Sequence, residues 1–305
     1  MNTIIHNSIH VLLALGLPPL LLGVIAKTKA LVAGRVGPPL LQPYYDLVKL
    51  FQKGSVFSTT TTWVFRAGPV VGLATAAIAA WMIPLADGSA PISFTGDMIL
   101  LAYLLGLGRF FTAAAALDTG SSFEGMGAAR EVTFACLAEP ALFLGMLVLV
   151  RLSGSLQLSG MLGGSLASHW QTAGASLALV LISWFIVLLA ENSRIPFDDP
   201  NTHLELTMIH EVMVLDHSGP AFGMILYGAA LKLFVFAALV VRLALPLATG
   251  FAWLDWPVFV GGMLAVAVVI GVVESTMARL RLVQVPVLLV AACLLSGFGI
   301  IVLVR

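Results

Sequence analysis

The chain has 305 residues, of which 60% are hydrophobic and only 10% charged, and its formal net charge is zero. A soluble globular protein carries about 25% charged residues, so the composition excludes an ordinary soluble domain. The neutral balance also gives no indication of a nucleic-acid partner. The two cysteines, Cys136 and Cys293, lie in separate apolar segments without CxxC or Cys/His spacing. This argues against a disulfide framework, a zinc site or an iron–sulfur cluster held by this chain alone.

Apolar segments long enough to cross a bilayer recur along the whole chain. A membrane-spanning helix needs about 20 such residues, and long runs without alternation favour helices over a barrel. The first run has no basic segment before it and no small-residue cleavage site, so we take it as a span and not as a signal peptide. We predict an all-α polytopic membrane protein, a single membrane domain over residues 1–305, with short interfacial helices. The eight expected spans are 8–26, 63–86, 97–117, 132–151, 174–191, 220–246, 256–276 and 282–304.

The basic residues are distributed unequally between the two sides that these spans define. Ten of the fifteen Lys and Arg residues fall in the odd-numbered connections and three on the other side. The positive-inside rule therefore predicts that both termini lie outside and that the odd connections lie in the cytoplasm. The main cytoplasmic loops are expected at about 27–62, 118–131 and 192–219.

The first of these loops contains RVGPPLLQPYYDLVKLFQKGSV, starting at Arg35. After Pro43 the apolar residues recur at helical spacing opposite Asp46 and Lys49, which predicts a short amphipathic helix in the membrane interface. A plain connecting helix is the alternative interpretation.

The stretch ENSRIPFDDPNTHLELTMIHEVMVLDHSGP, residues 191–220, holds seven charged residues and half of the six histidines. Pro196 and Pro200 end the preceding helix, and a new short helix is expected from about residue 202. His203, His210 and His217 would share one face if that helix continued unbroken. No HExxH pattern accompanies them, so we expect polar packing against another protein or a water-filled cavity, and no metal site.

Acidic residues lie within or at the ends of several expected spans. Glu139 falls in mid-span beside Pro140, and Glu191 ends the fifth span. Ionisable groups at this depth cost about 2.5–3.5 kcal/mol each on insertion scales, so they normally face a hydrated interior. Glu124, Glu131 and Glu139 share one face if the helix continues through the glycines between them. We therefore predict a proton path made of carboxylates. The alternative is a set of static ion pairs with Arg109, Arg130, Arg194 or Lys232.

Two motifs resemble one known family. The run RVGP…LLQPYYDLVKLF is similar to the segment after the first span of the quinone-chamber membrane subunit of complex I, and ENSRIPFDDP resembles the E-x-x-R-x-P-F-D-x-P run of its third cytoplasmic loop. THLELTMIHEVMVLDHSGP and LDTGSSFEGMGAARE are closer to the homologous anchor of energy-converting membrane-bound [NiFe] hydrogenases, of the formate-hydrogenlyase and hydrogenase-4 types. The resemblance covers nearly the whole chain and favours this hydrogenase branch.

The resemblance implies a membrane anchor that couples redox chemistry to ion translocation without performing the redox step, so the isolated chain is expected to catalyse nothing. The partners would be hydrogenase-like large and small subunits with iron–sulfur proteins in a cytoplasmic arm, and antiporter-like membrane subunits. The [NiFe] centre and iron–sulfur clusters would be bound by these partners and no cofactor by this chain. The expected location is the cell inner (cytoplasmic) membrane.

The same resemblance assigns candidate site residues, none of them catalytic or metal-binding. The proton path would include Glu131, Glu139, Glu191, Asp198 and Glu205. The interface with the arm would include Arg35, Asp46, Lys49, Arg130, Arg194 and Asp199, together with His203 and His210.

Two other functions remain open at this point. One is the quinone-chamber subunit of an NADH-quinone oxidoreductase, with quinone as its ligand. The other is a stand-alone secondary transporter, which often shows inverted repeats. No convincing repeat relates the two halves of this sequence, which disfavours the transporter.

Overall fold

The computed structural model describes residues 3–86, 90–198, 208–246 and 251–304. Within these ranges the chain is helical, with no strand, and eight helices are long and apolar enough to span a membrane. The predicted all-α, multi-pass membrane protein is therefore confirmed. The elements are α1 (Thr3–Val32), α2 (Gln42–Phe51), α3 (Trp63–Met82), α4 (Asp97–Asp118), α5 (Ser122–Ser153), α6 (Leu158–Met161), α7 (Leu166–Glu191), the 3₁₀ turn η1 (Glu211–Val214), α8 (Gly219–Ala244), α9 (Ala252–Thr276) and α10 (Val285–Val304).

Two of the long helices begin earlier than their apolar segments indicate. α5 starts at Ser122 and runs without interruption through Gly125 and Gly127, and α7 starts at Leu166 with a kink at Ala173. Hydropathy marks the part of a helix that suits the bilayer core, whereas the backbone continues to hydrogen-bond beyond it. The continuity of α5 matters because it fixes Glu124, Glu131 and Glu139 on one helix.

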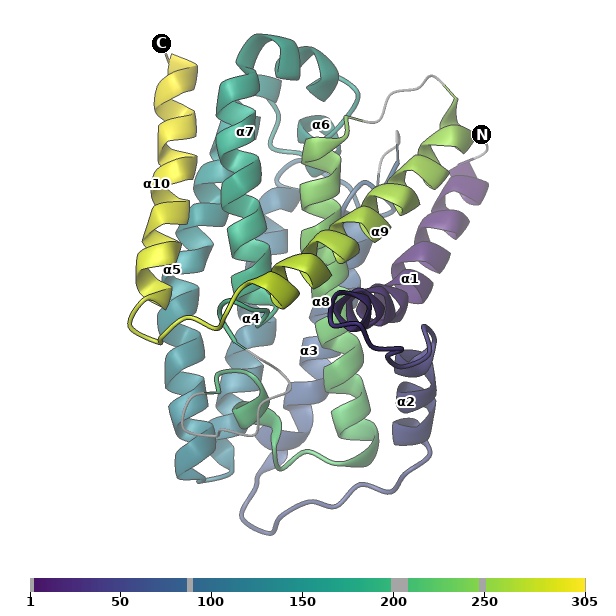
Figure 1. Ribbon diagram of the computed structural model, residues 1–305, viewed down its shortest axis with the longest axis vertical. Coiled ribbons are helices and arrows are strands. Elements are labelled where there is room, and N and C mark those ends of the chain that lie inside the picture. The colour runs from purple at the N-terminus through teal and green to yellow at the C-terminus, as the bar shows by residue number, and fades with distance from the viewer. Residues whose placement is uncertain (1–2, 87–89, 199–207, 247–250, 305) are drawn as a thin grey trace.

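The long helices pack in pairs around α8, which is buried along most of its length and contacts α1, α2, α3, α7 and α9. α3 packs on α4, α5 packs on α7 and α10, and α1 packs on α9, which crosses the other helices obliquely (Figure 1). Both termini lie at one end of the bundle, as eight crossings require (Figure 1). The connections that follow α1, α4, α7 and α9 therefore lie at the other end, called here the loop end.

Glycines allow α3 and α4 to approach closely. A Cβ atom on Gly68 would lie 2.8 Å from the Cβ of Ala115, and one on Gly108 would lie 2.7 Å from the hydroxyl oxygen of Thr75. Close backbone approach at small residues is the usual way that helices pack in membranes. The contact brings the middle of α4, and so Arg109, against α3.

Helix α1 bends where two prolines interrupt its hydrogen bonds. Pro19 has no N–H to donate to the carbonyl of Leu15, and the Tyr227 hydroxyl of α8 donates to that carbonyl over 2.7 Å. The next carbonyl, that of Gly16, accepts from the hydroxyl of Tyr44 in α2. The hydroxyl groups of two tyrosines thus bind the backbone carbonyls at the bend of α1. The same contacts hold α2 beside α1 and α8. The predicted helix after the RVGP motif is confirmed, and Asp46 and Lys49 lie on its exposed side.

Candidate functional site

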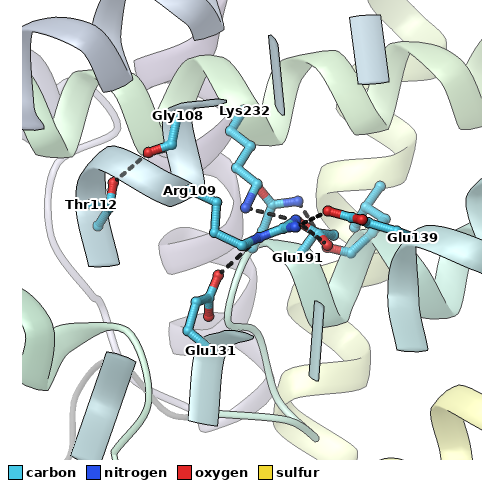
Figure 2. A network of polar contacts seen from close by, with 9 residues as sticks. Gly108, Arg109, Thr112, Glu131, Glu139, Glu191 and Lys232 are labelled. Carbon is cyan, nitrogen blue, oxygen red and sulfur yellow. Dashed lines mark hydrogen bonds and ion pairs between the residues drawn. The ribbon is translucent and has the colours of Figure 1, made fainter. Parts of the chain in front are cut away.

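Arg109, in the middle of α4, lies at the centre of a charged network inside the bundle (Figure 2). Its Nη2 atom lies 2.7 Å from each carboxylate oxygen of Glu191, at the end of α7. Its Nη1 atom pairs with Glu139 of α5, and its Nε atom lies 3.8 Å from Oε1 of Glu131, two turns earlier on α5. Lys232 of α8 contributes a second cation, with Nζ 2.8 Å from Oε2 of Glu191. Four helices therefore place one ionisable network at one depth.

The network carries more negative than positive groups. Three carboxylates share two cations, which leaves one formal negative charge in excess when all three acids are ionised. The side chains of Arg109 and Glu191 are only 9% and 5% exposed, whereas that of Glu139 is 44% exposed. An unbalanced charge in a poorly solvated site is costly, and binding one proton removes the cost.

A cavity of about 300 Å³ extends from this network toward the loop end. It lies between α3, α4, α8 and the segment that follows α7, and most of its wall is apolar. A water molecule occupies about 30 Å³ in the liquid, so the cavity has room for roughly ten. The charged side chains in its wall are Arg109, Glu131, Glu191, Arg194, Asp198, Glu211 and Lys232.

Asp198, nearer the loop end, is 1% exposed and is held by three groups. Its Oδ2 accepts hydrogen bonds from the backbone N–H groups of Ile209 (2.9 Å) and His210 (3.2 Å), and its Oδ1 lies 2.8 Å from Nη2 of Arg279. One buried carboxylate thus joins residue 198 to residues 209–210 and to the connection between α9 and α10.

A second buried carboxylate, Glu274 at the end of α9, joins two other elements. It pairs with Lys29 near the end of α1 (2.8 Å) and with Arg194 in the segment after α7 (3.4 Å). Arg194 therefore lies between the cavity and α9.

The structure brings together three of the five predicted proton-path acids, Glu131, Glu139 and Glu191, at a single arginine. Asp198 lies in the wall of the same cavity, and Glu205 lies outside the described residues. Glu124 shares α5 with this group but points to the loop end, where its Oε1 accepts the N–H of Asp216. The predicted pairing with Arg109 and Lys232 is present as well, so the acids are paired and also line a cavity.

The predicted interface residues fall into two sets. Arg35, Asp46 and Lys49 are exposed at the loop end. Arg130 and Arg194 point inward, since Arg130 donates to the carbonyl of Met208 (2.8 Å) and Arg194 pairs with Glu274. His210 is half-buried in the cavity wall. Asp199 and His203 lie outside the described residues.

The histidines of the third loop do not form a continuous helical face over the described part. His210 precedes the 3₁₀ turn η1, and His217 lies in an extended connection before α8. His217 is buried, and its ring stacks on that of Phe65 with centroids 3.9 Å apart. Burial lowers the pKa of His217 to about 4, because the uncharged ring is favoured away from water.

Sequence reasoning did not assign a site role to Lys232, Lys29, Glu274 or Arg279. The available signal was their charge at or near apolar spans, because such residues are functional candidates by default in a membrane protein. Lys232 and Arg242 are the two charged residues among the 26 residues of α8. This signal does not identify the ion-pair partner of each residue, because the partners meet only when helices distant in sequence pack together.

Comparison with known proteins agrees with this architecture. Residues 6–305 match the family model described as NADH dehydrogenase. The chain is 32% identical to formate hydrogenlyase subunit 4 of Escherichia coli (strain K12), over 92% of each chain. It is 36% identical to hydrogenase-4 component C of the same organism, over 75% of this chain and 71% of that protein. A chain of the membrane-bound sulfane sulfur reductase, an archaeal respiratory membrane complex, has the same fold, with a TM-score of 0.82, 21% identity and 98% coverage of both chains. The chain belongs to the NADH dehydrogenase family, as a relative of formate hydrogenlyase subunit 4 and hydrogenase-4 component C.

Proposed function

We propose that this chain is the membrane anchor and proton-coupling subunit of a complex I-like, energy-converting hydrogenase. A peripheral arm with hydrogenase-like large and small subunits and iron–sulfur proteins docks on the loop end, and antiporter-like subunits pack beside the bundle. The [NiFe] centre and iron–sulfur clusters belong to the arm and perform the redox step. The loop end faces the cytoplasm, both termini face away from it, and the membrane is the cell inner membrane. The similarity to formate hydrogenlyase subunit 4 over 92% of each chain supports this assignment.

The observation that carries the proposal is the sharing of Arg109 by Glu131, Glu139 and Glu191 beside a cavity that extends toward the loop end. In the proposed mechanism, a proton enters along the cavity wall and is held among these carboxylates. Glu139 is the most exposed of the three, so it passes the proton onward from the bundle. The positive charges of Lys232 and Arg109 keep the remaining acids ionised, so that these acids do not bind further protons.

A docked redox module biases this site by electrostatics. A unit charge about 15 Å away, in a medium of effective dielectric constant about 20, changes the energy of a carboxylate by roughly 1 kcal/mol. That energy changes a protonation equilibrium about fivefold. The protonation of a network with one acid in excess shifts under such a change in energy. The protonation of a fully neutralised ion pair shifts much less.

The test uses the whole complex in inverted membrane vesicles, with hydrogen evolution and proton uptake measured together. Glu139→Gln is expected to abolish uptake while the arm retains hydrogen evolution, because the amide cannot carry the proton. The matched control is Asp216→Asn, an acid-to-amide change at an exposed loop-end position, which is expected to change neither rate. Unchanged proton uptake in Glu139→Gln would remove this residue from the path.

The cavity favours a second candidate, a quinone-binding chamber. Its wall is mostly apolar with a few charged groups, and its volume lies at the lower limit of small-molecule sites. The discriminating measurement is whether membranes that contain the complex evolve hydrogen or reduce an added quinone. Quinone reduction that requires this chain would establish the second function in place of the first.

A further inference from the structure

The connection between α9 and α10, residues 277–284, contacts the segment that follows α7 at two points. Arg279 pairs with Asp198 over 2.8 Å, and the N–H of Leu280 donates to the carbonyl of Pro196 over 2.9 Å. One helical turn earlier along the chain, Glu274 pairs with Arg194. Residues separated by about 80 positions in sequence are thus tied together at the loop end.

Asp198 is the centre of this contact. Because its carboxylate also accepts the N–H groups of Ile209 and His210, it joins the two ends of the 198–209 segment. The carboxylate is 1% exposed, and a buried charge that loses its partner is strongly destabilising. Arg279 contributes the opposite charge, so the position of Asp198 against Ile209 and His210 depends on a residue of the α9–α10 connection.

Asp198 and His210, which this contact joins, form part of the cavity wall. Arg194, Asp198 and His210 all line the cavity that leads to Arg109. Among the residues that the structure describes, Arg279 forms no ion pair with the Arg109 network, and it does not line the cavity. Its influence on the cavity therefore passes through Asp198.

The two helices joined by this connection belong to different parts of the bundle. α9 packs on α1 and α8, whereas α10 packs on α5 and α7. α5 and α7 carry Glu131, Glu139 and Glu191. The connection consequently spans the boundary between the helices that carry the acids and the helices on the opposite side of α8.

We propose that Arg279 is a positioning residue for coupling, which holds Asp198 and with it the cavity wall above the Arg109 network. The inference rests on the proposed function, since it takes the cavity as the route between the loop end and that network. Arg279 is not itself a proton carrier in this proposal, and it acts through Asp198.

The first test measures the ratio of protons taken up to hydrogen evolved by the whole complex in inverted vesicles. Arg279→Gln is expected to lower this ratio about threefold or more, within the range by which single residues modulate coupling, with hydrogen evolution unchanged. Arg279→Lys keeps the charge and is expected to restore most of the ratio. Arg281→Gln, an exposed arginine two residues away, serves as the matched control and is expected to leave it unaltered.

A double variant tests whether Arg279 acts through Asp198, with the free energy of unfolding as its readout because Asp198 is itself a predicted proton-path acid. Arg279→Gln with Asp198→Asn removes both charges of the ion pair, so the double variant is expected to be no less stable than Arg279→Gln alone. Independent defects would add. Additive losses, or an equal loss in Arg281→Gln, would overturn the proposal.

A second readout does not require ion translocation. In a complex whose Cys136 and Cys293 are replaced by serine, Ser193→Cys places one thiol in the cavity wall. A membrane-impermeant maleimide is expected to label it about threefold faster when Arg279 is changed to Gln, and at the original rate in Arg281→Gln. Equal labelling rates in all three backgrounds would refute the positioning role. An unmodified complex that takes up no protons would instead refute the proposed function, and the labelling rates would still decide the role of Arg279.

Discussion

Both carboxylate oxygens of Glu191 lie 2.7 Å from one nitrogen of Arg109, the Nη2 atom, although the two residues are 82 positions apart in sequence. The same guanidinium pairs with Glu131 and Glu139 through its other nitrogens. Arg109 is therefore the common partner of all three acids.

Replacement of this arginine is expected to damage both stability and coupling. In Arg109→Gln three buried or half-buried acids would share only Lys232, and loss of one partner of a buried ion pair costs about 3–5 kcal/mol. The expected results are a lower free energy of unfolding in detergent and loss of proton uptake by the complex. Arg66→Gln, an exposed arginine over the Phe57 ring, is the control and is expected to cost less than about 1 kcal/mol. Equal losses of stability in the two variants would contradict the central role of Arg109.

The bend of α1 gives a prediction about packing. Tyr227→Phe removes the hydroxyl that satisfies the Leu15 carbonyl at the Pro19 interruption. Hydrogen bonds between membrane helices contribute about 0.6 kcal/mol on average and up to about 1.7, so a loss of stability in this range is expected from denaturant titration. Tyr103→Phe, on a side chain that is 73% exposed, is expected to leave the free energy of unfolding unchanged. A loss in Tyr103→Phe as large as that in Tyr227→Phe would argue against the contact.

Burial of His217 predicts a pH dependence of stability. Its pKa is lowered to about 4 in the folded protein, whereas a histidine in the unfolded chain has a pKa of about 6.5. Between these values the unfolded chain binds a proton that the folded one does not. The free energy of unfolding should therefore fall as the pH falls from 6.5 toward 4, by up to about 1.4 kcal/mol per pH unit from this group. Above pH 6.5 the group contributes no slope.

The measurement compares unfolding of the protein and of His217→Phe at several pH values. Phenylalanine keeps an aromatic ring against Phe65 but cannot be protonated, so the variant should show a shallower decline between pH 6.5 and 5. Parallel curves would indicate that His217 is already charged in the folded protein.

The helices and the acids were predictable from the sequence for simple reasons. Apolar runs of about 20 residues have few alternatives to membrane helices, and a charge such as Glu139 in such a run signals an internal site. Which acid each cation would meet was not predictable. Arg109 and Glu191 meet only because α4 and α7 converge, and neither sequence spacing nor charge specifies that. Arg279 likewise looked like an ordinary loop arginine, since Asp198 lies 81 positions away.

Gly127 connects this packing to the proposed docking surface. A Cβ atom there would collide with Cγ1 of Val212 and lie 2.9 Å from both the carbonyl oxygen of Ile209 and Cγ of Met213. Gly127→Ala should therefore displace the 208–214 segment from α5, at a cost of about 1–3 kcal/mol for overpacking. The segment lies at the loop end, so less of the peripheral arm should copurify with the variant chain.

The control for that experiment lies two residues away on the same helix. A Cβ atom on Gly125 would meet only Cδ2 of Leu117, at 3.9 Å, which is an ordinary contact. Alanine is favoured over glycine within a helix by about 1 kcal/mol, so Gly125→Ala should be neutral or slightly stabilising and should retain the arm. If both variants lost the arm equally, or if Gly127→Ala retained it fully while the free energy of unfolding fell, the 208–214 segment would have no part in docking. The arm would then depend on the exposed residues around α2, where Arg35, Asp46 and Lys49 lie.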